Sequence, residues 1–536
     1  MSETKLIYKD VSPTAKLFCN PTAEDKQPFN DLTQLNRDTG NFQGYATCEH
    51  NSRVLDGTSA DFNYNGDFGY WSLTKSGADC SFTTPVKLTL TYSTPVSFVG
   101  LTITFDQNHY EYARKFSMKA YFLNELVSDE TYHINKPQFF TNKQLTNVDK
   151  IEFIFYETSL PERYLKLNLI DYGITRVFTN DELMNVKVAE EVNLVSSELS
   201  VNNMNFTLVS EDPIAFLFQK KQPLELYYNG KLIGVFFIDK ARQKAETTWD
   251  ITTSDYIGVL TKASYNGGLF TGEMASVIIK DIMDTCHVPY LLDVDSFVDI
   301  PLYGYLPIGT AREALQQVLF ACSATADTSR SSVIDMYKMP TSVNGEYMQI
   351  MENSTFDQEE KVTEVRLTVH DYVKKIEPDE IAKGNATGTV EITFSGAYSD
   401  LSITGGSITL SGANYAIIEA AGDYVLSGYG YEDNMTIMSK KNPTTAANEL
   451  QNIMEVSSAT LVSKYNAATV LNNLYAFFIR TSIANVKIVS DELSVGDLIN
   501  YSTKYLGEKR GHVISNTFNL NSSKIVADCE VLDYDS

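Results

Sequence analysis

The chain has 536 residues, which at about 100–200 residues per domain predicts three to five domains, and its formal net charge is -25. A surface this acidic repels phosphate backbones, and the sequence contains no cluster of Lys and Arg, so the composition argues against nucleic-acid recognition. The six cysteines are scattered without a CxxC pair, which argues against a structural zinc site, and no apolar run approaches the ~20 residues that span a bilayer.

The N-terminal segment lacks the features of an export signal. Met1–Leu6 contains no apolar stretch of the kind that a signal peptide carries. We therefore expect the protein to be made and folded in a cytoplasm. Residues 1–45 are polar and rich in turn-forming residues, which predicts an N-terminal arm.

Residues 46–172 alternate apolar and polar side chains over several short stretches. A period of two residues places one face of each strand in a core and the other in water. The expected strands cover residues 86–92, 101–105, 116–121, 151–155 and 165–169. Several such strands, separated by turns at short spacing, predict an antiparallel β-sandwich.

Residues 173–260 continue the strand pattern and predict a second β domain. The expected strands cover residues 183–194, 205–209, 224–228 and 232–238. Between the last two stands Asn229-Gly230, the pair favoured in a type I′ turn because both residues tolerate positive φ. A β-hairpin is therefore expected there.

The periodicity changes in residues 261–354, which predict a small α/β domain. Thr310 and Glu313 have the spacing of a capping box, which marks the start of a helix. Apolar residues follow on one helical stripe at Leu315, Val318, Leu319 and Cys322. Residues 273–284 predict another helix.

Strand character returns in residues 355–378 and again in residues 480–536. The stretch between them is divided. Residues 379–440 are rich in Gly, Ser and Thr with short β patterns, which predicts an inserted β-rich domain. Residues 441–479 predict a helical connection. The fold class expected from these patterns is mainly β with a small α/β unit.

Candidate catalytic or metal-binding motifs are incomplete. Cys286 and His287 are neighbours in sequence, whereas nucleophile and base usually meet only in the fold. Residues 61–67 resemble half of a calcium loop, but the twelfth position is Ser72 instead of a bidentate Glu. Acidic pairs cannot be told from surface acids, so a cell-wall hydrolase is the least favoured function. We expect no enzymatic activity, no cofactor and no metal.

One loop carries a candidate binding site. Residues 106–112 lie between two expected strands and contain Asn108, His109 and Tyr110. An aromatic ring beside amide and imidazole groups could hold a sugar face and its hydroxyls. The alternative is an ordinary solvated loop.

Two stretches resemble known families. The first combines Leu55-Asp56-Gly57, Tyr70-Trp71-Ser72, Gly100-Leu101-Thr102-Ile103 and Pro161-Glu162-Arg163-Tyr164-Leu165-Lys166. In this pattern, residues 46–172 resemble the galactose-binding-like (discoidin-type) sandwich found in phage tail proteins. The second combines Ile174-Thr175-Arg176-Val177, residues 223–238, Ala311-Arg312-Glu313-Ala314-Leu315 and Leu493-Ser494-Val495-Gly496-Asp497-Leu498-Ile499. It resembles the baseplate hub (tail-associated, late-control-D-like) proteins of tailed phages.

The second resemblance implies an architecture and a set of partners. It implies two tail-tube-like β-barrels per chain, here residues 173–260 and residues 355–378 with 480–536. Three chains would form a homotrimeric ring around a channel that joins the tail tube to the tail tip, touching tube, distal tail and tip proteins. The expected location is the virion tail, assembled in the bacterial cytoplasm. The alternative function is a tail adhesin that binds host surface glycan through Asn108, His109 and Tyr110.

Overall fold

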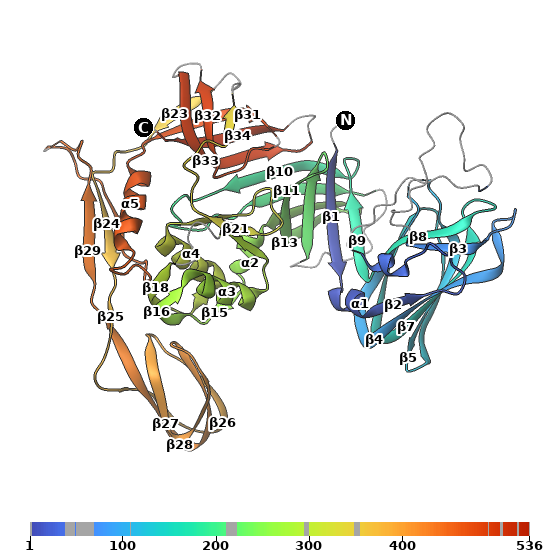
Figure 1. The fold of residues 1–536 in the computed structure, drawn as a ribbon, viewed down its shortest axis with the longest axis horizontal. Helices are drawn as coiled ribbons and strands as arrows, with labels where there is room; N and C mark the ends of the chain where they lie inside the picture. The colour runs from blue at the N-terminus through green and yellow to red at the C-terminus, as the bar shows by residue number, and fades with distance from the viewer. Residues whose placement is uncertain are drawn as a thin grey trace. The chain divides into compact units, whose positions relative to one another are not determined.

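The computed structural model describes residues 3–37, 49, 69–107, 109–210, 222–293, 300–347, 354–446, 448–490, 492–503, 507–521 and 525–534. The chain divides into two compact units. The sandwich unit comprises Ile7–Val177 with Ile214–Gln222, and the large unit comprises Met1–Leu6, Phe178–Pro213 and Pro223–Ser536. Strands dominate both units and helices gather in one part of the large unit, so the expected fold class, mainly β with a small α/β unit, is confirmed (Figure 1).

The sandwich unit is built on one strongly bent antiparallel sheet. Its strand order is β3 (Tyr70–Lys75), β8 (Tyr164–Asp171), β4 (Ser81–Phe105), β7 (Gln138–Thr158), β5 (Ala113–Phe122) and β6 (Glu125–His133), with β2 (Cys19–Thr22) also paired to β4. Helix α1 (Pro13–Phe18) and a 3-10 turn (Leu32–Asn36) precede the sheet. The β4–β7 register shifts between Thr91 and Val96, and both halves of β4 contribute to one core. The alternation in the sequence thus produces a sheet wrapped around its apolar face.

The large unit contains a long sheet that runs through both expected barrel regions. Its order is β23 (Thr355–Gln358), β31 (Ser482–Val489), β34 (Val526–Asp533), β33 (Gly507–Asn519), β10 (Leu183–Glu191), β11 (Asn203–Val209), β14 (Thr248–Ser254), β13 (Lys231–Ala245) and β12 (Pro223–Tyr228). Strand β32 (Leu498–Thr503) pairs with β33, and β22 (Gly345–Tyr347) with β32. Strands β1 (Thr4–Val11) and β9 (Gly173–Phe178) complete the sheet order, and their bounds cross the division between the units. The expected hairpin at Asn229-Gly230 joins β12 to β13 with positive φ at both residues.

This sheet contains an internal structural repeat. The first repeat is β10-β11-β14-β13-β12, and the second repeat is β23-β31-β34-β33, with β32 on β33, so the pairing order is the same. The third pairing of each repeat has a bulge at the equivalent place, between Ile238 and Lys240 in β13 and between Val513 and Ser515 in β33. Pairing of β10 with β33 joins the two repeats inside the chain. The bulges fix which residue of one repeat corresponds to which residue of the other.

The α/β part lies between the repeats in sequence. Its helices are α2 (Tyr256–Leu260), α3 (Ala275–Cys286) and α4 (Ala311–Cys322). Its short strands are β15 (Ser264–Tyr265), β16 (Gly268–Met274), β17 (Tyr290–Leu292), β18 (Pro301–Leu306), β19 (Gly309–Thr310), β20 (Thr325–Asp327) and β21 (Ile334–Tyr337). The capping box of Thr310 and Glu313 is present, and the predicted stripe on α4 is buried. Both features of the α4 prediction are confirmed.

One strand pairs differently from its sequence assignment. Residues 355–378 are expected in the second barrel, and β23 does join the long sheet. Strand β24 (Glu364–Val369) instead pairs with β29 (Thr436–Lys441) and β30 (Ile453–Val456), against helix α5 (Ala467–Phe478). Alternating residues predict that a strand exists but not which strand lies beside it. The domain boundaries themselves remain predictions.

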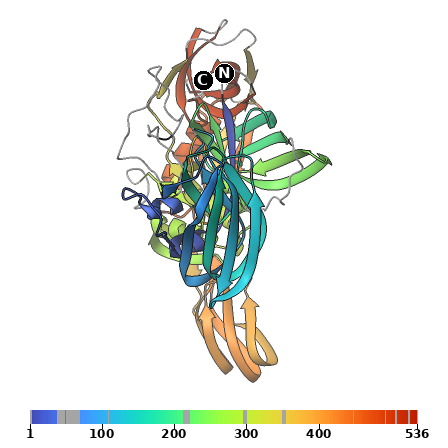
Figure 2. The same ribbon diagram turned by 90° about the vertical axis from the view of Figure 1, so that its right-hand side faces the viewer.

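The inserted β-rich segment folds back on itself. Its strands are β25 (Tyr372–Lys374), β26 (Asp379–Thr393), β27 (Tyr398–Ser411) and β28 (Tyr415–Asp433), and β28 pairs with all three others. Near the middle of the three long strands stand Gly388, Gly405 and Gly422, all with positive φ. Each strand bends there, and the two halves enclose a small core that includes Ile418 and Leu426. The strands are drawn in orange in Figures 1 and 2.

Candidate functional site

The predicted sugar-binding loop of the sandwich unit is only partly described, because Asn108 lies outside the described residues. The imidazole Nδ1 of His109 lies 3.0 Å from a carboxylate oxygen of Asp106, and this hydrogen bond raises the pKa of His109. Tyr110 is 59% exposed at positive φ, and its ring meets Tyr112 edge to face at 5.9 Å. Of the three predicted residues, the structure thus brings an exposed aromatic ring and a carboxylate-paired imidazole onto one loop. Sugar binding by these residues stays a prediction.

A buried ionic cluster belongs to the same unit. The Nζ atom of Lys166 lies 2.7 Å from a carboxylate oxygen of Glu49 and 2.6 Å from one of Glu111. The Nε atom of Arg163 donates to Glu111 at 2.8 Å. All four side chains are at most 7% exposed. Two cations and two carboxylates balance each other, so the cluster is suited to holding the fold rather than to reacting.

One face of the long sheet is polar from end to end. Paired residues share a face, so the register defines rows across the strands. One row runs through Thr355, Asn485, Glu530, Ser515 and Glu191. A second row runs through Asn519, Lys187, Asn205, Thr252 and Lys240. Every member of these rows is half-buried or exposed. We call this surface the polar face.

The opposite face of the same strands is apolar and buried. It carries Val188, Met204, Ile251, Val486 and Phe518 at no more than 4% exposure. Over β31, β33 and β34 the polar face is hollowed by a cavity of about 300 Å³, whose lining includes Asn485, Lys487, Thr517, Asp528 and Glu530. Strand alternation therefore gives one sheet with a dry side and a hydrated side that is continuous across both repeats.

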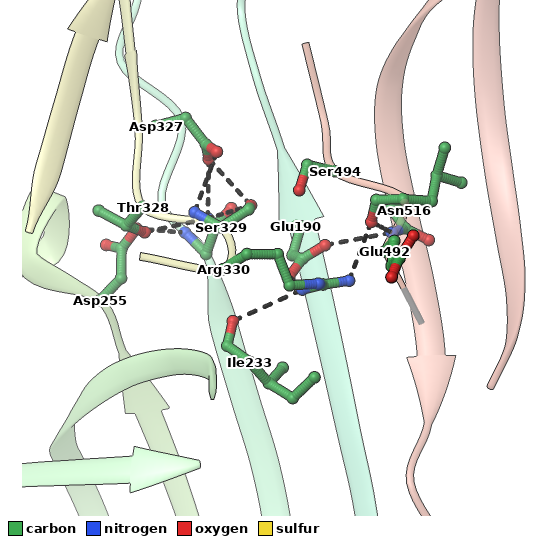
Figure 3. A network of polar contacts seen from close by, with 12 residues as sticks. Glu190, Ile233, Asp255, Asp327, Thr328, Ser329, Arg330, Glu492, Ser494 and Asn516 are labelled. Carbon is green, nitrogen blue, oxygen red and sulfur yellow. Dashed lines mark hydrogen bonds and ion pairs between the residues drawn. The ribbon is translucent and has the colours of Figure 1, made fainter. Parts of the chain in front are cut away.

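A buried polar network fills the junction of the two repeats with the α/β part (Figure 3). Arg330, in the loop after β20, pairs with the carboxylate of Glu190 on β10. Its guanidinium also donates to the carbonyl of Leu493 at 3.0 Å. Asn516 on β33 donates to Glu190 at 3.1 Å. One side chain of the α/β part thus ties strands of both repeats together.

The network continues around the carboxylate of Asp255, which accepts from Thr328 at 2.6 Å. Asn202 donates to Asp327 at 3.1 Å. Burial raises the pKa of Glu190 to about 7 and that of Asp255 to about 6. Three buried carboxylates face a single guanidinium, so burial disfavours full ionisation. The sequence analysis missed this network because its members lie far apart in sequence and carry no motif.

The described residues contain no group of three or more His, Cys, Asp or Glu placed to hold a metal ion. Cys286 donates its thiol to the carbonyl of Ile282 at 3.1 Å, and burial raises the pKa of that thiol. His287 ends α3 in the left-handed region, with φ 54. These two residues have the environment of a helix end. Among the described helices, none is both long and apolar enough to cross a membrane.

No protein-family model matches the chain, and no curated protein matches it. Among solved structures, the chain is similar to a 43 kDa tail protein of prophage MuSo2 from Shewanella oneidensis, at 9% identity, 67% of this chain, 96% of that chain and TM-score 0.42. It is also similar to a tail protein from Neisseria meningitidis MC58, at 10% identity, 66% of this chain, 95% of that chain and TM-score 0.42. Wild-type discoidin II from Dictyostelium discoideum is similar at 9% identity, 46% of this chain, 90% of that chain and TM-score 0.21. Similarities at these scores establish no shared fold for the whole chain.

Proposed function

We propose that the chain is a structural, non-enzymatic subunit of a phage or phage-like tail, in which three copies form a baseplate hub ring between tail tube and tail tip. The observation that carries the proposal is the long sheet, in which two equivalent repeats are joined edge to edge. A repeat that joins its neighbour through a strand edge can be continued by further copies until the ring closes. The resemblance noted in the sequence supplies the number three and the place in the tail.

The polar face supports a role as the wall of a channel. A wall that lets a polymer pass has to be hydrated and free of apolar patches that would hold the polymer. The two rows across the polar face contain only polar or charged side chains, of both signs. On this proposal the ring contacts tail-tube, distal-tail and tip proteins, lies in the virion tail and is assembled in the bacterial cytoplasm.

The test is the oligomeric state of the full chain. Native mass spectrometry and light scattering after size exclusion are expected to give a trimer, and class averages from electron microscopy should show a ring with a central channel. A chain that stays monomeric at high concentration, alone and with purified tail tube, would refute the proposal. So would oligomers that lack an open centre.

A second candidate function is glycan binding by the sandwich unit. The observation that favours it is Tyr110, whose exposed ring stands beside Tyr112 and the carboxylate-paired His109. Such rings stack on the apolar face of a sugar. On an array of bacterial wall polymers, Tyr110→Ala should lose binding. Tyr465→Ala, which removes a ring of 63% exposure from the large unit, should keep it. Absence of binding by the unaltered chain would eliminate this candidate.

A further inference from the structure

The joint between the two repeats is a pairing of β33 with two successive strands along one edge. Residues 507–512 of β33 pair with β32, and residues 515–519 pair with β10. The other edge of β33 pairs with β34. The half of β33 that follows the bulge therefore receives the first strand of the other repeat.

The first repeat has the same strand without that last partner. Residues 231–237 of β13 pair with β12 as residues 507–512 of β33 pair with β32. The half of β13 that follows its bulge pairs with β14 on one edge, and no described strand pairs with its other edge. Strand β23, the equivalent of β10, pairs only with β31 among the described strands. Each chain thus has one open acceptor edge and one open donor strand.

The register of the missing pairing follows from the repeat. Lys240 follows the bulge of β13 as Ser515 follows that of β33, so Arg242 corresponds to Thr517. Thr355 pairs with Asn485 as Lys187 pairs with Asn205, so Asp357 corresponds to Ala189. Ala189 lies opposite Thr517 within the chain. The equivalent pairing sets Asp357 opposite Arg242.

We propose that β23 of one copy pairs antiparallel with the distal half of β13 of a second copy, with Asp357 opposite Arg242 and Glu359 opposite Lys240. The proposal rests on the proposed ring and names the contact that closes it. In each copy the partner is the same chain, so a single type of joint, inside and between copies, builds the whole sheet.

Charge supports this pairing and its register. The β13 edge carries Lys240, Arg242 and Lys244, all exposed, although the chain is strongly acidic. The β23 segment presents Asp357 and Glu359, also exposed, and Glu360 follows. In the derived register each of the two named pairs has opposite signs, which stabilises directly opposed side chains on antiparallel strands. A shift of one residue would separate these charges onto opposite faces.

The first experiment reverses the charges in the full chain. The variant Lys240→Glu/Arg242→Glu and the variant Asp357→Lys/Glu359→Lys should each raise the apparent dissociation constant of the ring at least about tenfold, because two attractions become repulsions. The chain that carries all four changes should recover assembly, since its pairs are again opposite in sign. Equal melting temperatures of the dissociated variants control for folding.

A second experiment tests the register. Asp357→Cys combined with Arg242→Cys should give covalent multimers under mild oxidation, because directly opposed Cβ atoms lie about 4.5–5.5 Å apart. Asp357→Cys combined with Lys240→Cys, displaced by two residues, should crosslink far less. The chain with its native cysteines alone measures the background.

The outcomes separate this contact from the ring itself. An unaltered chain that never assembles refutes the ring and this proposal with it. A ring that survives both charge reversals unchanged leaves the proposed function standing and overturns the β13–β23 contact. Dissociation without recovery in the fourfold variant, or equal crosslinking at both cysteine pairs, also overturns the pairing.

Discussion

At the scale of single residues, the junction network shows why buried charge survives in this chain. Glu190 is 2% exposed and is held by Arg330 and Asn516, which belong to different parts of the large unit. Burial alone raises its pKa, and the nearby guanidinium lowers it only in part. Removing Arg330 would leave a buried carboxylate without its counter-charge, which costs several kcal/mol in comparable sites, on the order of 3–5.

The pKa of Glu190 gives stability a definite pH dependence. The folded value of about 7 lies above the model value of 4.5, so this group stabilises the fold most below pH 4.5 and loses that contribution as pH rises through 7. The difference in unfolding free energy between the unaltered chain and Glu190→Gln should therefore shift by about 3 kcal/mol, against the unaltered chain, between pH 4.5 and pH 8. Denaturant unfolding of both chains at the two pH values measures it. A difference that does not change with pH would contradict this assignment.

At the scale of elements, the inserted sheet shows how glycine allows long strands to fold over. Gly405 has φ +82, and an added Cβ would meet the carbonyl oxygen of Asp423 at 1.9 Å. Gly388 has φ +103, and an added Cβ would meet nothing within 4 Å. Both positions disfavour a side chain through their backbone angle, but only Gly405 lacks the space for one.

These two glycines therefore make a matched pair of substitutions. Gly388→Ala should cost roughly 1–2 kcal/mol, the penalty of a left-handed backbone for an L-residue. Gly405→Ala should cost more, because backbone of β28 must also move. Hydrogen exchange of amides in β27 and β28 should quicken strongly in Gly405→Ala and weakly in Gly388→Ala. The reverse order would show that backbone angle and not space controls the bend.

At the scale of the whole molecule, the inserted segment is a separable part of the large unit. It has its own core, and the amide of Lys375 donates to the carbonyl of Gly430 at 2.9 Å where the segment leaves and rejoins the chain. Near its far end, Asn414 is fully buried and donates to the carbonyls of Asn266 and Leu306 at 2.8 and 3.0 Å. The long sheet needs none of these residues for its pairing.

Replacing residues 376–429 by an Asn-Gly turn should leave the rest of the chain folded. The residues on either side already form a hydrogen-bonded pair, which a two-residue turn can close. We expect the same oligomeric state as the full chain and a melting temperature that changes little, since only the Asn414 contacts are lost. Light scattering and thermal unfolding check both. Loss of assembly in the shortened chain would show that the inserted segment belongs to the interface.

How much could be predicted from the sequence depends on how local each feature is. The Asn229-Gly230 hairpin and the capping box of Thr310 and Glu313 depend on neighbouring residues, and both were predicted correctly. Strand β24 was recognised as a strand, but its pairing with β29 rather than with the long sheet was not. The polar loop at His109 and Tyr110 could be located, whereas its pairing with Asp106 could not.

The sequence by itself determined that this protein is mainly β, where its α/β part lies and which faces of its strands meet water, because these follow from periodicity, turns and caps within short windows. Only the tertiary structure decided that two distant strand sets form equivalent repeats joined at β10 and β33, and that Arg330 meets Glu190. Strand edges are made of backbone groups common to almost every residue. A sequence therefore names a strand readily, and its partner only after the chain has folded.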